Sequence, residues 1–261
     1  MVEPLHVTQS GAVATVTMAR PEVHNAFNEE LIAELAAAFE RLGGDASVRV
    51  VVLTGEGRSF SAGADLEWMK RMSTATEAEN RADAKRLAAM LRAVAECPKP
   101  IVAKVNGAAI GGGAGLVATA DVAIASEKAK IGFAEVRLGI VPATIAPHVI
   151  AKIGPGRALP LFLTGERFDA RNAMTIGLVH QVAADEDLDG AVDSVVEALL
   201  LGGPEAQARC KELVRRVAAE PGPGVDAYTS EMIGAARASA EGREGVAAFL
   251  EKRAPAWKAE G

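Results

Sequence analysis

The sequence has only two cysteines and no long apolar run. Cys97 and Cys210 show no C-x-x-C or other metal-ligand spacing, so we expect two reduced thiols and no metal site. No segment approaches about eighteen uninterrupted apolar residues, so we expect no membrane span. Met1–Ser10 lacks a basic segment followed by an apolar run, which predicts no signal peptide and a cytoplasmic location.

Positive charge is also scarce. The 28 lysine and arginine residues are outnumbered by 34 aspartate and glutamate residues, which gives a net charge of −6. This balance argues against nucleic-acid binding as the main function, and an anionic ligand would need a local basic patch. With 261 residues, of which 49% are hydrophobic, the chain is long enough for one large domain with a substantial core.

Strand and helix patterns alternate in the first half of the chain. Leu5–Gln9 and Ala12–Met18 alternate apolar and polar residues about a Ser-Gly turn, which predicts a hairpin. Asn28 can cap a helix that ends at the glycine pair Gly43–Gly44. Continuous apolar runs predict buried strands at Val48–Thr54, Ile101–Val105 and Asp121–Ala125.

Helical periodicity returns at Asp65–Glu96, after a loop at Glu56–Ala64, and a break is expected near Ser73. Repeated strand–loop–helix units of this kind indicate an α/β fold. From about Asp187 the pattern becomes wholly helical. We expect helices at Val192–Leu201, Glu205–Ala219, Val225–Ala240 and Arg243–Lys252.

The most informative segment is the glycine-rich run Asn106–Val117. Three consecutive glycines before a helix let backbone N–H groups approach a ligand, and the helix start adds unpaired donors and the positive end of its dipole. Such donors fit a phosphate or a developing oxyanion. Close packing of a strand against a helix also uses glycine. A dinucleotide fingerprint formally fits Gly113–Ala118, but it begins well after the strand ends at Val105 and no N-terminal βαβ unit precedes it.

A second small-residue turn lies upstream at Ser59–Asp65, again between a buried strand and a helix. Ala62, Gly63 and Ala64 are small enough to leave backbone N–H groups exposed, and Asp65 can cap the helix that follows. Taken alone, this is an ordinary helix cap. Two strand-to-helix turns at one edge of a sheet could each supply one donor to a single oxygen.

Together the two turns resemble the signatures of the crotonase family, the enoyl-CoA hydratases and isomerases. The likeness covers nearly the whole chain. Further segments that match in the expected order are Arg20–Phe27, Lys99–Gly107, Ala120–Ile124, Phe133–Gly139, Leu163–Phe168 and Phe249–Pro255.

The resemblance implies an oxyanion hole formed by the backbone N–H groups of Ala64 and Gly112. It also implies a catalytic carboxylate at Glu135. The second carboxylate of a typical hydratase would stand three residues after the middle glycine, where this chain has Gly115. Positioned acid–base groups contribute about 10²–10⁴ each to rate, so the missing one should matter. Glu67 is a minor candidate to replace it.

Three accounts of Gly115 remain open. The chain could be a 3,2-enoyl-CoA isomerase, in which one glutamate moves a proton, or a hydratase in which one glutamate is both base and acid. A third account is a substrate that brings its own carboxylate, because Ser61–Met69 and Gly139–Pro147 look like the methylglutaconyl-CoA hydratase branch. We favour a hydratase. The alternative from a different functional class is a protein that binds CoA thioesters but has little hydratase activity.

The resemblance also implies contacts to the substrate and its coenzyme A. The residues carried over for these contacts are Ser61, Ala62, Asp65, Leu66, Gly111, Trp68, His24 and Ala26. The cations expected nearest to the site are Lys70, Arg71, Arg20, Lys252 and Arg253. Trp68, Met69 and Met72 could line an acyl channel, although such residues at helical spacing are more often core. His148 is more often a packed or solvent-facing residue than a catalytic one.

The fold implied is an α/β crotonase-like spiral of β-β-α units over residues 1–190. A helical C-terminal oligomerisation region would follow over residues 191–261, giving a homotrimer or homohexamer. The ligand would be an acyl-CoA small molecule, with no cofactor beyond the coenzyme A of the substrate. No metal, nucleic-acid or membrane partner is expected.

Overall fold

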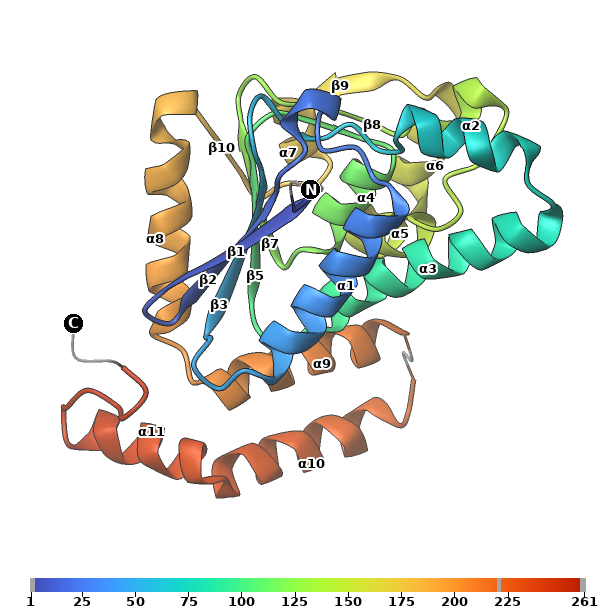
Figure 1. Ribbon diagram of the computed structural model, residues 1–261. Coiled ribbons are helices and arrows are strands. Elements are labelled where there is room, and N and C mark those ends of the chain that lie inside the picture. The colour runs from blue at the N-terminus through green and yellow to red at the C-terminus, as the bar shows by residue number, and fades with distance from the viewer. Residues whose placement is uncertain (1–2, 220–221, 259–261) are drawn as a thin grey trace.

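The computed structural model describes residues 3–219 and 222–258 and contains two sheets flanked by helices (Figure 1). The larger sheet has the strand order β1-β2-β3-β5-β7-β10. Its strands are β1 (Leu5–Ser10), β2 (Val13–Met18), β3 (Val50–Gly55), β5 (Ile101–Val105), β7 (Val122–Ser126) and β10 (Gln181–Ala183). The β1–β2 hairpin is antiparallel, as predicted, and the remaining pairs are parallel.

A smaller sheet has the order β4-β6-β8-β9. Its strands are β4 (Ser59–Ser61), β6 (Ala108–Ile110), β8 (Lys130–Gly132) and β9 (Arg167–Asp169). Along the chain, β3 leads into β4 and then a helix, β5 into β6 and then a helix, and β7 into β8 and then a 3-10 helix. These repeated turns confirm the predicted spiral of β-β-α units. The two small-residue turns singled out in the sequence lie where β4 and β6 end.

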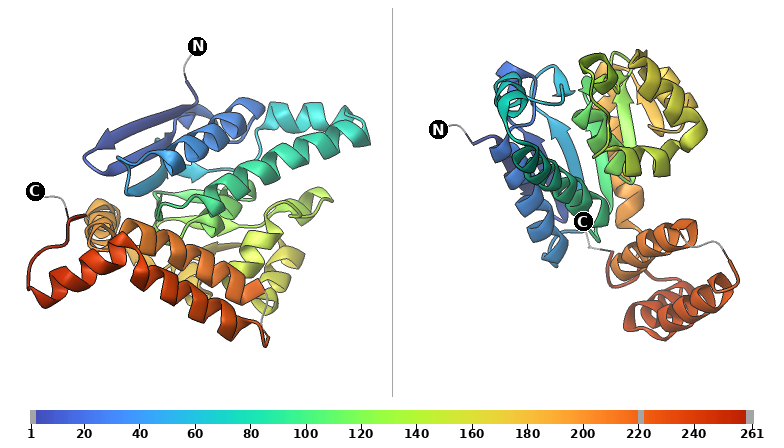
Figure 2. Two further views of the ribbon diagram at one scale, coloured as in Figure 1. Left: turned by 90° about the horizontal axis from the view of Figure 1, so that it is seen from below. Right: turned by 90° about the vertical axis from the view of Figure 1, so that its right-hand side faces the viewer.

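Helices pack on both faces of the larger sheet (Figures 1 and 2). In the body they are α1 (Glu29–Gly44), α2 (Leu66–Thr74), α3 (Glu77–Glu96), α4 (Gly112–Thr119), α5 (Ala146–Ile153), α6 (Pro155–Thr164) and α7 (Ala170–Thr175), with 3-10 turns η1 (Pro21–Val23), η2 (Glu135–Leu138) and η3 (Asp185–Asp187). All six residues of β3 are buried, as its β-branched run predicts. One hydrophobic core lies between this sheet and α1, α3 and α4.

Side-chain caps set several helix ends. The Asn28 side chain accepts from the backbone N–H of Leu31 at 2.9 Å, which confirms the predicted start of α1. The expected break near Ser73 falls at Ala75–Thr76. There Thr76 and Glu79 form a reciprocal capping box that starts α3. Both cysteines are free thiols, Cys97 buried and Cys210 exposed, as expected.

The C-terminal helices divide into one that covers the sheet and three that form an arm, of which the first, α9, contacts the body through Lys211 and Arg215 (Figure 2). Helix α8 (Leu188–Leu200) packs a second apolar cluster onto β3, β5 and β7. The arm consists of α9 (Pro204–Ala219), α10 (Val225–Ala238) and α11 (Ala240–Leu250). The predicted division after residue 190 stays a prediction, and α8 spans it.

Hydrogen bonds join the helices of the arm to one another and to the rest of the chain. The Glu241 carboxylate accepts hydrogen bonds from the backbone N–H groups of Glu205 and Ala206 at 2.8 Å, so α11 caps the start of α9. Arg49, just before β3, donates to the carbonyl oxygens of Gly202 and Trp257. These contacts join the tail to the lower end of the sheet.

Several elements differ from the sequence-based expectations. The segment Glu56–Ala64, expected as a loop, contains β4, because Ser59 and Ser61 pair with residues of β6. The smaller sheet and helices α5–α7 were not predicted, since strands of three residues are too short to show a period. Within the described ranges, none of the helices has the length and apolar character required to cross a bilayer.

Candidate active site

The turn after β4 holds the Ala64 amide in the open. A parallel β-bridge pairs Ala64 with Phe27. The two hydrogen bonds of this bridge are made by the residues on either side of Ala64. Phe27 donates to the Gly63 carbonyl at 2.6 Å, and the Asp65 N–H donates to the Phe27 carbonyl at 2.9 Å. The Ala64 N–H therefore points away from Phe27. It has no acceptor among residues 3–219 and 222–258.

The turn after β6 holds the second amide. Gly112 is the first residue of α4, so its N–H has no partner within the helix, and none of the described residues accepts from it. Gly111, which precedes it, has φ +53° and ψ −119°, a conformation that glycine adopts readily. The dipole of α4 adds positive potential at this end.

The two turns are in close contact. A Cβ atom placed on Gly63 would lie 3.6 Å from the Gly112 nitrogen and 2.7 Å from the Ile110 carbonyl oxygen. One placed on Gly113 would lie 2.4 Å from the Ser61 carbonyl oxygen. Glycine at both positions lets the backbones approach this closely. The structure thus brings the two predicted turns to one place.

Glu135 lies against the same turn. It is the first residue of η2, and a Cβ atom on Gly111 would be 3.1 Å from its Oε1. Its Oε2 is buried and accepts no hydrogen bond from the described residues. Burial raises the pKa of the carboxyl above the ordinary glutamate value of 4.5. A buried, unpartnered carboxylate beside two free amides is suited to proton transfer.

The space beside Gly115 is filled by an apolar side chain. A Cβ atom on Gly115 would lie 2.2 Å from Cγ2 of Ile145. Ile145 is 1% exposed and belongs to the core. No carboxylate side chain fits at this position while Ile145 stays where it is.

The buried side-chain amide of Asn25 supports the Ala64 turn through hydrogen bonds. Asn25 has no exposed surface, and its Oδ1 accepts from Arg20 N–H at 2.9 Å while Nδ2 donates to the Glu56 and Ser59 carbonyls. Asn25 and its neighbour His24 both have positive φ, near +55°. Two consecutive left-handed residues persist here because this network determines their conformation.

An ion pair fixes the start of α2. Asp65 caps the helix by accepting from Glu67 and Trp68 N–H groups, and its Oδ2 lies 2.9 Å from Nη2 of Arg20. Burial alone would raise the pKa of Asp65, but hydrogen bonds from Trp68 and Arg20 hold it below its usual value. The other guanidinium nitrogen of Arg20 donates to the Ala26 carbonyl at 2.5 Å. Arg20 and Ala26 are therefore part of the turn's framework.

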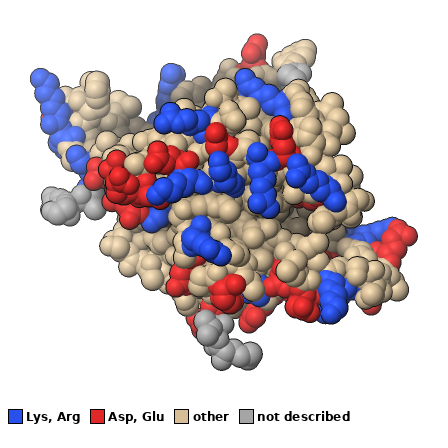
Figure 3. Space-filling view, turned by 90° about the horizontal axis from the view of Figure 1, so that it is seen from above, with Lys and Arg blue, Asp and Glu red and all other residues tan. Residues whose placement is uncertain are grey.

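A groove lined by residues of both charges lies at the starts of β4, β6 and β8. His24 contacts Ser59 Oγ at 3.0 Å through Nδ1 and Nη2 of Arg58 at 3.2 Å through Nε2. Arg58, Lys104, Lys128 and Lys130 line this groove of about 570 Å³ together with two carboxylates. Asp189 pairs with Lys104, and Asp185 pairs with Lys128. Seen from above, Lys and Arg side chains gather across the middle of the upper face of the molecule (Figure 3). Sequence reasoning missed Arg58, although it directly precedes the Ser59–Asp65 turn.

The remaining predicted contacts are divided by their exposure. Ser61 and Ala62 lie in the Ala64 turn, with Ser61 Oγ donating to the Asn25 carbonyl at 2.8 Å. Leu66 is 81% exposed at the start of α2 and is free to meet a ligand. Trp68 is 6% exposed, and its Nε1 donates to Asp83 at 3.3 Å, which favours the core role over the channel role.

The other proposed cations are less well placed. Arg71 pairs with Glu29 at 2.6 Å, and Lys70 is exposed on α2. Arg253 is held by Glu244 and Glu251 beyond α11, and Lys252 precedes it. Within one chain, α11, which these last two residues follow, lies away from the turns (Figure 1). Arg20 is the expected cation that reaches the Ala64 turn.

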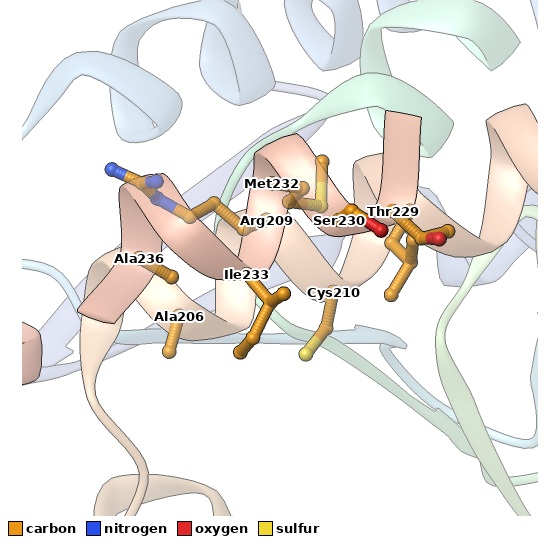
Figure 4. A pocket seen from close by; sticks show the side chains of 9 residues that line it. Ala206, Arg209, Cys210, Thr229, Ser230, Met232, Ile233 and Ala236 are labelled. Atoms are coloured by element: carbon orange, nitrogen blue, oxygen red, sulfur yellow. The ribbon is translucent and has the colours of Figure 1, made fainter. Parts of the chain in front are cut away.

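Two other features lie apart from the turns. A hollow of about 470 Å³ between α9 and α10 is mainly apolar, and Cys210, Met232 and Ile233 are among the residues that line it. Figure 4 shows Cys210 and Ile233 pointing in the same direction. His148, on α5, is half-buried and does not join the site. No group of three or more histidine, cysteine or acidic residues within the described part of the chain is arranged to hold a metal ion.

Comparison with known proteins gives a consistent result. Residues 8–260 match the family model described as enoyl-CoA hydratase/isomerase. The chain is 32% identical over 247 residues to a short-chain-enoyl-CoA hydratase of Clostridium acetobutylicum, covering 94% of each protein. A crystal structure of an enoyl-CoA hydratase from Shewanella pealeana is similar with a TM-score of 0.94 at 38% identity, covering 97% of this chain and 96% of that one.

Proposed function

Because the chain belongs to the enoyl-CoA hydratase/isomerase family, also called the crotonase family, we propose that it hydrates the α,β-double bond of an acyl-CoA thioester. The observation that carries this proposal is the meeting of the Ala64 and Gly112 turns beside Glu135. These three residues form the proposed catalytic centre.

The two amides would hold the thioester oxygen. When a nucleophile adds to the β-carbon, negative charge moves through the double bond to the carbonyl oxygen. Donors fixed in advance stabilise this enolate more than the ground-state carbonyl, and each one typically contributes about 10²–10³ in rate. Both N–H groups lack other acceptors among the described residues, so they are available for this role.

Glu135 would move the protons. As a carboxylate it removes a proton from water while the oxygen forms its bond to the β-carbon. The resulting acid then returns that proton to the α-carbon as the enolate collapses. Burial raises the pKa of Glu135. A higher pKa makes the carboxylate a stronger base toward water and lies nearer to neutral pH, which suits a group that both removes and returns a proton. The reaction consumes one water and needs no metal or redox cofactor.

We further propose a substrate that carries its own carboxylate, such as 3-methylglutaconyl-CoA. Support comes from Gly115, where Ile145 occupies the space of a second acidic side chain. A carboxylate on the acyl group would then help to orient the water. The competing function is 3,2-enoyl-CoA isomerisation, for which one glutamate suffices because no water is activated.

The coenzyme would enter over the upper face. Arg58, which contacts His24, and Lys130 line the groove and would attract the phosphates of coenzyme A, whereas Lys104 is already paired with Asp189. We also propose a cytoplasmic homotrimer or homohexamer. Large apolar side chains are exposed near η2 and at α11, and burial between subunits would remove them from water. Those that carry this argument are Leu138, Ile140, Val141, Phe249 and Leu250.

A spectrophotometric assay tests the reaction. Purified protein is incubated separately with crotonyl-CoA, 3-methylglutaconyl-CoA and a 3-enoyl-CoA, and the absorbance of the conjugated enoyl thioester is followed. Hydration removes this absorbance, whereas isomerisation of the 3-enoyl-CoA creates it. Turnover of 3-methylglutaconyl-CoA alone is the expected result. Turnover of crotonyl-CoA alone would overturn the carboxylate proposal, and turnover of neither 2-enoyl thioester would overturn the hydratase.

A further inference from the structure

A cavity of about 500 Å³ lies at the opposite end of α4 from Gly112, where α9 crosses the body. Helix α4 has eight residues and is therefore about 12 Å long, so this cavity is separate from the proposed catalytic centre. The cations that line the cavity are Lys152 of α5 together with Lys211 and Arg215 of α9.

Lys152 is placed at the carboxyl end of α4. Its Nζ donates to the carbonyl oxygen of Ala120 at 2.5 Å and, more weakly, to that of Asp121 at 3.5 Å. Its carboxylate neighbour, Asp121, is already paired with Lys211 at 2.6 Å. Two histidines also lie near Lys152, and neither brings a negative charge. His148, on the same helix, is half-buried and lines the cavity, and His180, just before β10, is exposed. Among the residues that the structure describes, Lys152 thus has no carboxylate of its own.

This environment favours the neutral amine. Burial lowers the pKa of Lys152 to about 8, with a further lowering by Lys211 that partly offsets the effect of Asp121. At pH 7 roughly one tenth of such amines are neutral, compared with roughly one in 2,500 for an ordinary lysine. Only the neutral amine is a nucleophile.

We propose that Lys152 is an N-acylation site that takes its acyl group from acyl-CoA thioesters entering the cavity beneath α4. The Lys152 nitrogen attacks the thioester carbonyl carbon and forms a C–N bond. The C–S bond breaks, and coenzyme A leaves as a thiolate that receives the proton released from the nitrogen. The products are an amide and the free thiol, so no further reactant is needed. Lys211 and Arg215 line the same cavity and would attract the phosphates of the coenzyme.

Acetyl-CoA is the probe that tests this inference. The intact protein is incubated with it between pH 6 and 10, and the occupancy of each lysine is followed by peptide mass spectrometry. Lys128 is the internal control, because it is exposed and Asp185 raises its pKa. At pH 7 the initial rate at Lys152 should exceed that at Lys128 at least tenfold, and it should level off above pH 8. A rate at Lys152 equal to or below that at Lys128 would overturn the proposal.

Two variants make the test specific. Lys152→Arg keeps a cation at the end of α4 but should remove the modification, and a peptide still acylated at the same rate would show that the site was misassigned. Arg215→Ala should slow acylation by acetyl-CoA but not by S-acetyl-N-acetylcysteamine, which has no phosphate. Equal slowing with both donors would contradict the role of Arg215 in coenzyme attraction.

Failure of this inference is distinguishable from failure of the proposed hydratase. Acetyl-CoA has no carbon–carbon double bond, so it cannot be hydrated. In the Glu135→Gln variant, acetyl-CoA should acylate Lys152 at the same rate as in the wild-type protein. A large loss of acylation in that variant would place the modification in the catalytic centre and overturn the separate cavity site.

Discussion

Ile145 fills the space that any side chain at position 115 would occupy, with its Cγ2 atom 2.2 Å from where a Cβ on Gly115 would stand. Gly115→Ala should therefore destabilise the protein by about 1–3 kcal/mol, the usual cost of overpacking a core. Chemical denaturation measures this change. Gly115→Ala combined with Ile145→Ala should lose less than the sum of the two single changes.

Gly190 provides the matched control for that experiment. It is an exposed glycine within α8, and a Cβ atom there meets nothing within 4 Å. Gly190→Ala should stabilise the protein by about 0.5–1 kcal/mol, because alanine favours the helix. If Gly115→Ala also stabilised the protein, Ile145 would not be the barrier to a side chain at this position.

Glu135→Gln should lower kcat by about 10²–10⁴, because glutamine cannot accept the proton from water. Circular dichroism should show an unchanged fold, since the two side chains have the same shape. The assay is loss of enoyl absorbance on the hydrated substrate. Glu40→Gln, an exposed change on α1, is the control and should leave kcat within a factor of about two of its original value. Substantial activity in Glu135→Gln would place the base elsewhere.

The raised pKa of Glu135 has consequences for both rate and stability. Hydration needs the carboxylate, so kcat should fall as pH decreases through a value above 4.5. Burial disfavours the ionised form of Glu135 in the folded state. The folded protein therefore has its full stability below the ordinary glutamate pKa and loses part of it as pH rises through the raised pKa of Glu135. Glu135→Gln should therefore unfold at a higher temperature at pH 7, and this gain should vanish near pH 4. A gain of the same size at both pH values would contradict this origin.

Asn25 should be sensitive to substitution for two separable reasons. Asn25→Ala leaves the Arg20 N–H and the Glu56 and Ser59 carbonyls without their partner, at about 1–3 kcal/mol for each buried group. Asn25→Gly loses the same hydrogen bonds but tolerates φ +55°. It should therefore be about 1 kcal/mol more stable than Asn25→Ala in urea denaturation. Equal stabilities would show that backbone strain is not significant here.

Asp65 should contribute to acid sensitivity. Its pKa is held below 3.8, so its contribution is present above that value and is lost as pH falls through the lower folded-state pKa. Asp65→Asn leaves Arg20 buried without its anion. The expected cost at pH 7 is about 3 kcal/mol, the low end for a broken buried pair, because asparagine still caps α2. The difference between the two proteins should narrow below pH 3, as measured by thermal unfolding.

Residues with strong local signals were predicted well. The Asn28 cap, the Ile101–Val105 strand and the four C-terminal helices follow from capping chemistry, β-branched runs and helical period. The smaller sheet was missed, because a strand such as Ser59–Ser61 is defined by its partner and has no period of its own. Local sequence decides the first group, and tertiary pairing decides the second.

The candidate site shows the same division. Gly112 and Ala64 lie in turns that small residues mark in the sequence, and Glu135 was placed through the family resemblance. Ile145 could not be predicted, because its contact with Gly115 depends on how α5 packs on α4. Arg58 carries a charge that any surface residue could carry, and only its contact with His24 distinguishes it.

Both proposed oxyanion donors are main-chain groups, so the chemistry they supply is independent of side-chain identity. Systematic alanine replacement would pass over one of them, which is already alanine. At the other, an added methyl group would collide with the ring of Phe27, so any loss of rate would be confounded with misfolding. Exchanging the amide for an ester at position 64 or 112, by chemical synthesis or ligation, deletes the donor alone. Natural variation could likewise reshape the acyl-binding surface around these two atoms without altering them.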